Sequence, residues 1–138
     1  MNILIRTRRI IEHLFILAQD IVPVKSSRLA ACIVLKNNVI GYGFSQMKSH
    51  PFQAEFAKNE DAIYLHAETD CIKNALRRVS HEEIAKSTLY IARAKRDNKN
   101  RYWMYGLAKP CPGCARAIAT FGIEKVVYTL DGNDYKYM

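Results

Sequence analysis

The spacing of apolar residues predicts a helix near the start of the chain. Apolar side chains at positions 10, 11, 14, 17, 18 and 21 recur with the period of an α-helix. The segment starts basic and turns apolar, as a signal peptide does. However, Glu12 and His13 interrupt its apolar part, and no small-residue cleavage site follows Asp20. We therefore expect an amphipathic helix that packs on the domain.

The next residues have the pattern of a β-hairpin. Two β-rich runs within SRLAACIVLKNNVIGYGFS are joined by Lys36-Asn37-Asn38, and asparagine tolerates the backbone of a tight turn. A longer connection of mixed polarity, QMKSHPFQAEFAKNEDAI, comes next. Because long connections often carry binding residues, we expect this one to build part of a pocket.

The second half of the chain alternates helix and strand patterns. An apolar stripe predicts a helix over 66–79, and the following segments are a strand over 87–94, a loop over 95–110, a helix from Cys111 that Gly122 ends, and a last strand in KVVYT. Alternation of strands and helices favours parallel strand pairing. We predict one domain over 1–138, an α/β fold of three layers with a mixed β-sheet flanked by helices.

Composition and charge are those of a folded globular protein. Of the 138 residues 49% are hydrophobic and 25% charged, and no apolar run approaches the roughly 20 residues that span a bilayer. We expect a cytoplasmic protein. The net charge is +8, and half of it lies in RAKRDNKNR (93–101), which has five basic residues and one acidic residue. This segment is either a solvated loop or a surface that faces phosphate groups.

The four cysteines fall into two kinds. Cys32 lies in a strand-like apolar run and Cys71 on the apolar side of a helix pattern, so both are expected to be small buried hydrophobic residues. Cys111 and Cys114 stand three residues apart at a predicted helix start, which places both thiols on one face. The helix dipole favours the thiolate form that binds metals.

His66 also stands at a predicted helix start and supplies a third ligand, so the three residues predict a zinc site with one position open for water. His50 is the more plausible fourth ligand, ahead of Cys32 and Cys71, if the site is closed. Glu68 stands two residues after His66, at a different angle on the helix. That position suits a general acid and base beside the metal rather than a ligand.

These residues resemble a known signature. His66-Ala67-Glu68 with Pro110-Cys111-Pro112-Gly113-Cys114 is similar to the H-x-E…P-C-x-x-C motif of the zinc-dependent cytidine and deoxycytidylate deaminase superfamily, over about residues 28–129. The resemblance implies a cytidine-deaminase-like fold, a Zn²⁺ cofactor and hydrolytic release of ammonia from a cytosine ring, with Glu68 moving the proton. It also implies contact of the base edge with the backbone of Ala67 and with Pro110, and a homo-oligomer.

The resemblance leaves the substrate open. Where relatives that act on free nucleotides carry an asparagine, this chain has Ser45, whose hydroxyl has a shorter reach. The KSHP that follows resembles an element of some small deaminases, so Lys48 and His50 are pocket candidates, although they could equally belong to a surface loop. Trp103, with Tyr102 and Tyr105, could stack on a base of a strand, stack on one nucleotide or pack at a subunit interface.

Three hypotheses follow from these observations. The first is a deaminase of a free cytosine nucleotide, most simply a deoxycytidylate-like monophosphate. The second is a deaminase of a base within single-stranded DNA or RNA, or of a purine. The third is a zinc-containing nucleic-acid-binding protein without turnover. The chain stops ten residues after KVVY. The last strand of the family is therefore short and formed by NDYKYM, or missing, and the absence of further helices favours a small substrate.

Overall fold

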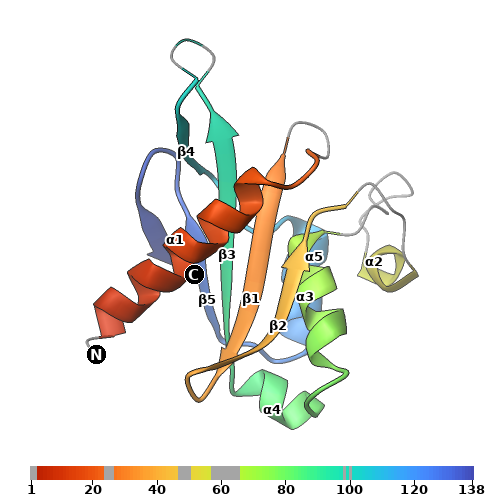
Figure 1. The fold of residues 1–138 in the computed structure, drawn as a ribbon. Coiled ribbons are helices and arrows are strands. Elements are labelled where there is room, and N and C mark those ends of the chain that lie inside the picture. The colour runs from red at the N-terminus through yellow and green to blue at the C-terminus, as the bar shows by residue number, and fades with distance from the viewer. Residues whose placement is uncertain (1–2, 24–26, 47–50, 57–65, 98, 100) are drawn as a thin grey trace.

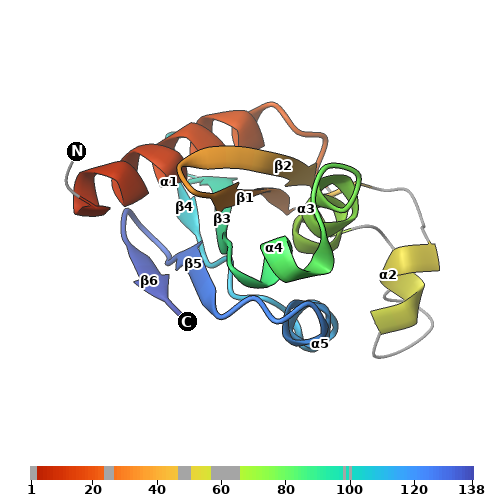
Figure 2. The same ribbon diagram turned by 90° about the horizontal axis from the view of Figure 1, so that it is seen from below.

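The computed structural model describes residues 3–23, 27–46, 51–56, 66–97, 99 and 101–138. Within them the strands form one mixed sheet in the order β2-β1-β3-β5-β6. Strand β4 pairs with the last residues of β3, past the part of β3 that pairs with β5. Helix α1 crosses one face of the sheet, and α3 and α5 cover the other face (Figures 1 and 2). The predicted three-layer α/β architecture is therefore confirmed.

The elements follow one another in an order close to the predicted one. They are α1 (Ile3–Gln19), β1 (Arg28–Leu35), β2 (Asn38–Phe44), α2 (Pro51–Phe56), α3 (Ala67–Ala75), α4 (His81–Ala85), β3 (Thr88–Arg96), β4 (Trp103–Gly106), α5 (Pro112–Thr120), β5 (Lys125–Thr129) and β6 (Tyr135–Tyr137). None of the described helices is long and apolar enough to cross a membrane.

The predicted hairpin and the predicted parallel pairing are both present. Strands β1 and β2 pair antiparallel, and the turn between them holds Lys36 at φ 49° and Asn37 at φ 69°. Asparagine is among the residues that adopt this left-handed backbone most easily. Strands β3 and β5 pair parallel, because α5 returns the chain to the end of the sheet at which β3 begins.

The prediction of a loop over 95–110 is wrong in part. Strand β3 continues to Arg96, and Trp103–Gly106 pairs with it as β4, so the charged segment forms a hairpin. The short helix α4 was also not predicted, although Ser80 and Glu83 form a complete capping box at its start. The last strand is short and lies within NDYKYM, as one of the predicted alternatives has it.

The two faces of the sheet bury separate apolar clusters. Side chains of α3, α5 and the odd-numbered positions of β3, such as Leu89 and Ile91, form one cluster. Side chains of α1 and the even-numbered positions of β3, such as Tyr90 and Ala92, form the other. Because strand side chains alternate between faces, an odd or even residue number on β3 indicates which of the two layers the side chain faces.

Helix α3 lies unusually close to β2. A Cβ atom at Gly43 would clash with the carbonyl oxygen of Ala67 and with the backbone of Cys71, whose Cα would be 2.8 Å away. The side chain of Asp70 accepts hydrogen bonds from the N–H of Phe44 and from the amide of Gln46, each 3.0 Å long. Absence of a side chain at Gly43 therefore determines where the first turn of α3 lies.

Replacing Gly43 with alanine should push α3 away from the sheet. Overpacking of this kind costs about 1–3 kcal/mol, so we expect the free energy of unfolding of Gly43→Ala to fall by about that amount in urea titrations. Arg77→Ala changes an exposed side chain after α3 and should shift the value by less than about 0.5 kcal/mol. Equal stability of Gly43→Ala and the parent protein would contradict the close approach.

Candidate metal centre

The two sequence motifs meet at one edge of the sheet. His66 is the N-cap residue of α3 and Cys111 is the N-cap residue of α5, each in extended backbone. Pro112 occupies the first turn of α5, where its missing N–H costs nothing. Both helices run away from the edge at which β3 ends (Figure 1). The prediction that each motif opens a helix is confirmed, and the two helix starts lie at the same rim of the sheet.

Three ligand-type side chains converge there. The Nδ1 atom of His66 lies 3.2 Å from Sγ of Cys114 and 3.5 Å from Sγ of Cys111, and the three atoms are all within 4.8 Å of one another. Nitrogen and sulfur atoms bound to one tetrahedral zinc ion are about 3.5 Å apart. The donor set and its spacing therefore fit zinc without rearrangement.

The thiols of this group are electrostatically inequivalent. Hydrogen bonds from the Cys114 thiol and from His66, together with the Cys114 backbone N–H at 3.4 Å, lower the pKa of Cys111 to about 3 against the effect of burial. The pKa of Cys114 is raised, because its thiol donates to Cys111 and is buried. The start of α5 thus stabilises a thiolate, the form of cysteine that binds metals.

Glu68 lies in the first turn of α3 and is only 4% exposed. Burial raises the pKa of its carboxyl group, while the nearby His66 and its own backbone N–H act in the opposite direction. Two further groups influence this pKa: the charge of Cys111 raises it, and a hydrogen bond with the side chain of Cys114 lowers it. An acid held in this way beside a metal-binding group can accept and return a proton.

The other cysteines are not part of this group. The thiol of Cys71 is fully buried and points to the sheet, where it donates to the carbonyl oxygen of Gly41 at 3.3 Å. Cys32 belongs to the apolar cluster beneath α1, on the other face, and burial raises its pKa to about 12. The prediction that both are buried hydrophobic residues is confirmed. His50, the other possible fourth ligand, lies outside the described residues.

Sequence reasoning missed a residue that holds His66 in place. Gln53 of α2 is 1% exposed, and its side-chain oxygen accepts a hydrogen bond of 3.1 Å from the backbone N–H of His66. The hydroxyl group of Thr69 donates to the same oxygen. Gln53 therefore caps the start of α3 from a separate helix. Its only sequence signal is its place in the long connection that was expected to help build a pocket.

The predicted substrate-binding residues are distributed unevenly. Ala67 and Pro110 are buried next to His66 and Cys111. Ser45 is buried directly after β2; its hydroxyl oxygen accepts from the N–H of Leu29 at 3.2 Å, and its N–H donates to the carbonyl oxygen of Leu29 at 3.1 Å. Ser45 thus extends the sheet by one residue at the edge where the motif helices start. Lys48, like His50, lies outside the described residues.

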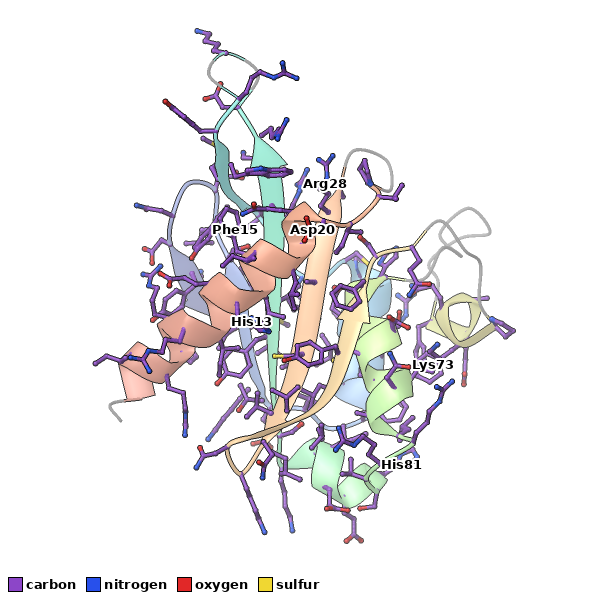
Figure 3. The ribbon with its side chains drawn as sticks, in the orientation of Figure 1. His13, Phe15, Asp20, Arg28, Lys73 and His81 are labelled. Atoms are coloured by element: carbon purple, nitrogen blue, oxygen red, sulfur yellow. The ribbon has the colours of Figure 1, made fainter. Side chains whose placement is uncertain are left out.

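Trp103 is not brought to this site. Its side chain packs with the cluster beneath α1, and the guanidinium carbons of Arg28 and Arg96 lie 5.1 Å and 4.7 Å from its ring centroid. Figure 3 labels Arg28 at the top of β1 and Phe15 on α1, on this face of the sheet. Trp103 and Phe15 line a cavity of about 610 Å³ there. The alternation of β4 places Trp103 on this face, which the prediction from composition could not reveal.

A family model agrees with the motif assignment. The model for the cytidine and deoxycytidylate deaminase zinc-binding region matches residues 6–130, which is most of the chain. A search among curated proteins gave no match.

Two solved structures with a similar fold are of one phage enzyme. The dCMP deaminase of cyanophage S-TIM5 in its apo form is 21% identical, with a TM-score of 0.62, and the match covers 94% of this chain and 86% of that one. The same enzyme in complex with dCMP and dUMP is 20% identical, with a TM-score of 0.59, over 93% and 82% of the two chains. The likeness extends over the whole three-layer fold.

The capping contact of Gln53 can be tested through metal affinity. Residues that orient a metal ligand typically contribute 10- to 100-fold to affinity, so Gln53→Ala should weaken zinc binding by about that factor in competition with a chromophoric chelator. Glu55→Ala removes an exposed side chain from the same helix and should leave the affinity unchanged. Parent-like zinc affinity in Gln53→Ala would show that α2 does not position His66.

Proposed function

Because this chain belongs to the family of zinc-dependent cytidine and deoxycytidylate deaminases, we propose that its substrate is a free cytosine nucleotide, a deoxycytidylate-like monophosphate. One observation carries the proposal: a buried carboxyl group, Glu68, stands beside the convergent side chains of His66, Cys111 and Cys114. In the reaction, water replaces the 4-amino group of the cytosine ring, which leaves as ammonia, and the product is the uracil nucleotide.

The chain's own side chains divide the work. His66, Cys111 and Cys114 hold the metal, and when bound, zinc supplies a Lewis acid that activates water at neutral pH. Glu68 takes the proton of that water, delivers it to the ring nitrogen and then moves a proton to the departing amino group. Burial of Glu68 supports this role, since a raised pKa makes the carboxyl group a better acceptor for a proton.

Two further observations support a nucleotide rather than a polymer. The similar phage enzyme is a dCMP deaminase, and one of its structures holds dCMP and dUMP. The basic segment 93–101 is also not a free loop, because Lys95 pairs with Asp131 at 2.9 Å and Arg96 lies over Trp103. These contacts use part of the charge that would otherwise be available to a polyanion.

A second candidate function rests on the tip of the β3–β4 hairpin. Lys99 and Arg101 are exposed there, and Tyr102 is 71% exposed beside them. Basic side chains with an exposed aromatic ring suit a single-stranded nucleic acid, whose phosphates and bases they contact. Under this alternative, the deaminated base belongs to DNA or RNA.

Ammonia release from a substrate panel tests both candidates. We expect the zinc-loaded protein to act on dCMP and not on short single-stranded oligonucleotides that contain cytosine. Glu68→Gln should retain one zinc ion per chain and lose activity by about 10²- to 10⁴-fold, because it removes the proton carrier and not a ligand. Glu124→Gln, a change of an exposed carboxylate, is the matched control.

The possible results separate the hypotheses. Release from oligonucleotides alone would replace the first function with the second. Release from adenine or guanine nucleotides alone would assign a purine substrate. If no compound yields more ammonia with the parent protein than with Glu68→Gln, the catalytic proposal fails, and zinc would then serve a binding protein.

A further inference from the structure

Arg93 lies on the sheet face that carries the candidate metal centre. It follows Leu89 and Ile91 at the odd-numbered positions of β3, and both of those side chains belong to the cluster beneath α3 and α5. Across the sheet, Arg93 is opposite Leu29 on β1 and Gly106 on β4. Leu29 is in turn hydrogen-bonded to Ser45. Ser45, Leu29 and Arg93 therefore form one row of side chains across the end of the sheet.

This row lies next to the two elements that lead to the motifs. The preceding row on the same face contains Gly43, Ala31 and Ile91, and the carbonyl oxygen of Ala67 rests against Gly43. The row of Ser45, Leu29 and Arg93 therefore lies just beyond the first turn of α3. On the other side, Gly106 begins the five-residue path to Cys111. Arg93 stands between the end of β2 and the segment that leads to the second motif.

The side chain of Arg93 is held in place, but in the described part of the chain one of its nitrogen atoms has no partner. Its Nε atom is buried and has no hydrogen-bond partner among the described residues. Gly106 gives the side chain its room, since a Cβ atom there would lie 2.7 Å from Cδ and 2.9 Å from Cγ of Arg93. Buried polar groups in native proteins are almost always paired, so this nitrogen is a donor that a bound ligand can use.

The carboxylate of Asp131 does not supply this partner. Asp131 is the carboxylate on which Arg93 acts, but Asp131 already accepts hydrogen bonds from Lys95 at 2.9 Å and from the N–H of Leu107 at 3.1 Å. The pKa of Asp131 is lowered mainly by those two donors and only weakly by Arg93. Arginine presents a rigid fork of donors that matches the oxygens of a phosphate group.

We propose that Arg93 binds the phosphate of the nucleotide and so makes the site select a monophosphate over the corresponding nucleoside. The proposal rests on the function assigned above and adds the residue that recognises the charged end of the substrate. Ser45, in the same row, lies on the path between this phosphate site and the start of α3.

The experiment compares Arg93→Gln with Arg96→Gln, which removes an arginine from the same strand but from its other face. For Arg93→Gln, we expect kcat/KM on dCMP to fall about 10- to 100-fold, the range for a hydrogen bond to a charged group, and kcat/KM on deoxycytidine to stay within about threefold. Arg93→Lys should recover part of the loss, because it keeps the charge. Thermal melting and zinc content confirm that each variant is folded and loaded.

Binding measurements keep the inference separate from catalysis. Calorimetry with dUMP and deoxyuridine on zinc-loaded protein should show weaker dUMP binding in Arg93→Gln and unchanged deoxyuridine binding. Equal losses on the phosphorylated and unphosphorylated compounds would overturn the proposal and leave Arg93 a structural residue. A loss confined to single-stranded oligonucleotides would also overturn it and assign the phosphate to a polymer. If ammonia release fails but dUMP binding responds as expected, only the catalytic proposal is lost.

Discussion

The contact between the first turn of α3 and the glycine of β2 determines where the chemistry of this protein takes place. Gly43 has no side chain, so the backbone of Ala67 and Cys71 rests directly on the strand. His66 and Glu68 are the neighbours of Ala67 in sequence, so the position of Ala67 determines theirs. Asp70 then fixes the rotation of the helix by binding the N–H of Phe44. A bulkier residue at Gly43 would move the histidine away from two cysteines that depend on a different helix.

The sheet separates Arg93 and Trp103, which are close together in the sequence. Residues 93–106 hold both Arg93 and Trp103, but their side chains emerge on opposite faces of the β3–β4 hairpin. The arginine faces the helices that carry the motifs, while the tryptophan lies between two arginines on the α1 side. One hairpin therefore contributes to the proposed substrate site and to the packing of the opposite layer.

Local patterns were enough to predict the main elements and the metal-binding group. The helical stripe after His66, the apolar strand KVVYT and the paired motifs all carry their information within a few residues. The sequence did not predict features that depend on contacts between residues far apart in the chain. Strand β4 forms because β3 offers it a partner, although its charged neighbours suggest a loop. The role of Gln53 arises from a helix that meets α3 only in the folded chain. The face occupied by Trp103 follows from strand register, which composition does not contain.

The N-terminal helix and the C-terminal strand are fastened to each other. The hydroxyl groups of Thr7 and Tyr137 are 3.3 Å apart, and Arg8 donates to the carbonyl oxygen of Asn133 at 3.0 Å. The cluster beneath α1 also includes Val127 of β5, so it joins residues from both ends of the sequence. Contacts between distant parts of a chain form late, because the loop between them must close first. During synthesis, this layer can be completed only when the last strand has left the ribosome, whereas the β1–β2 hairpin pairs residues that are close in sequence.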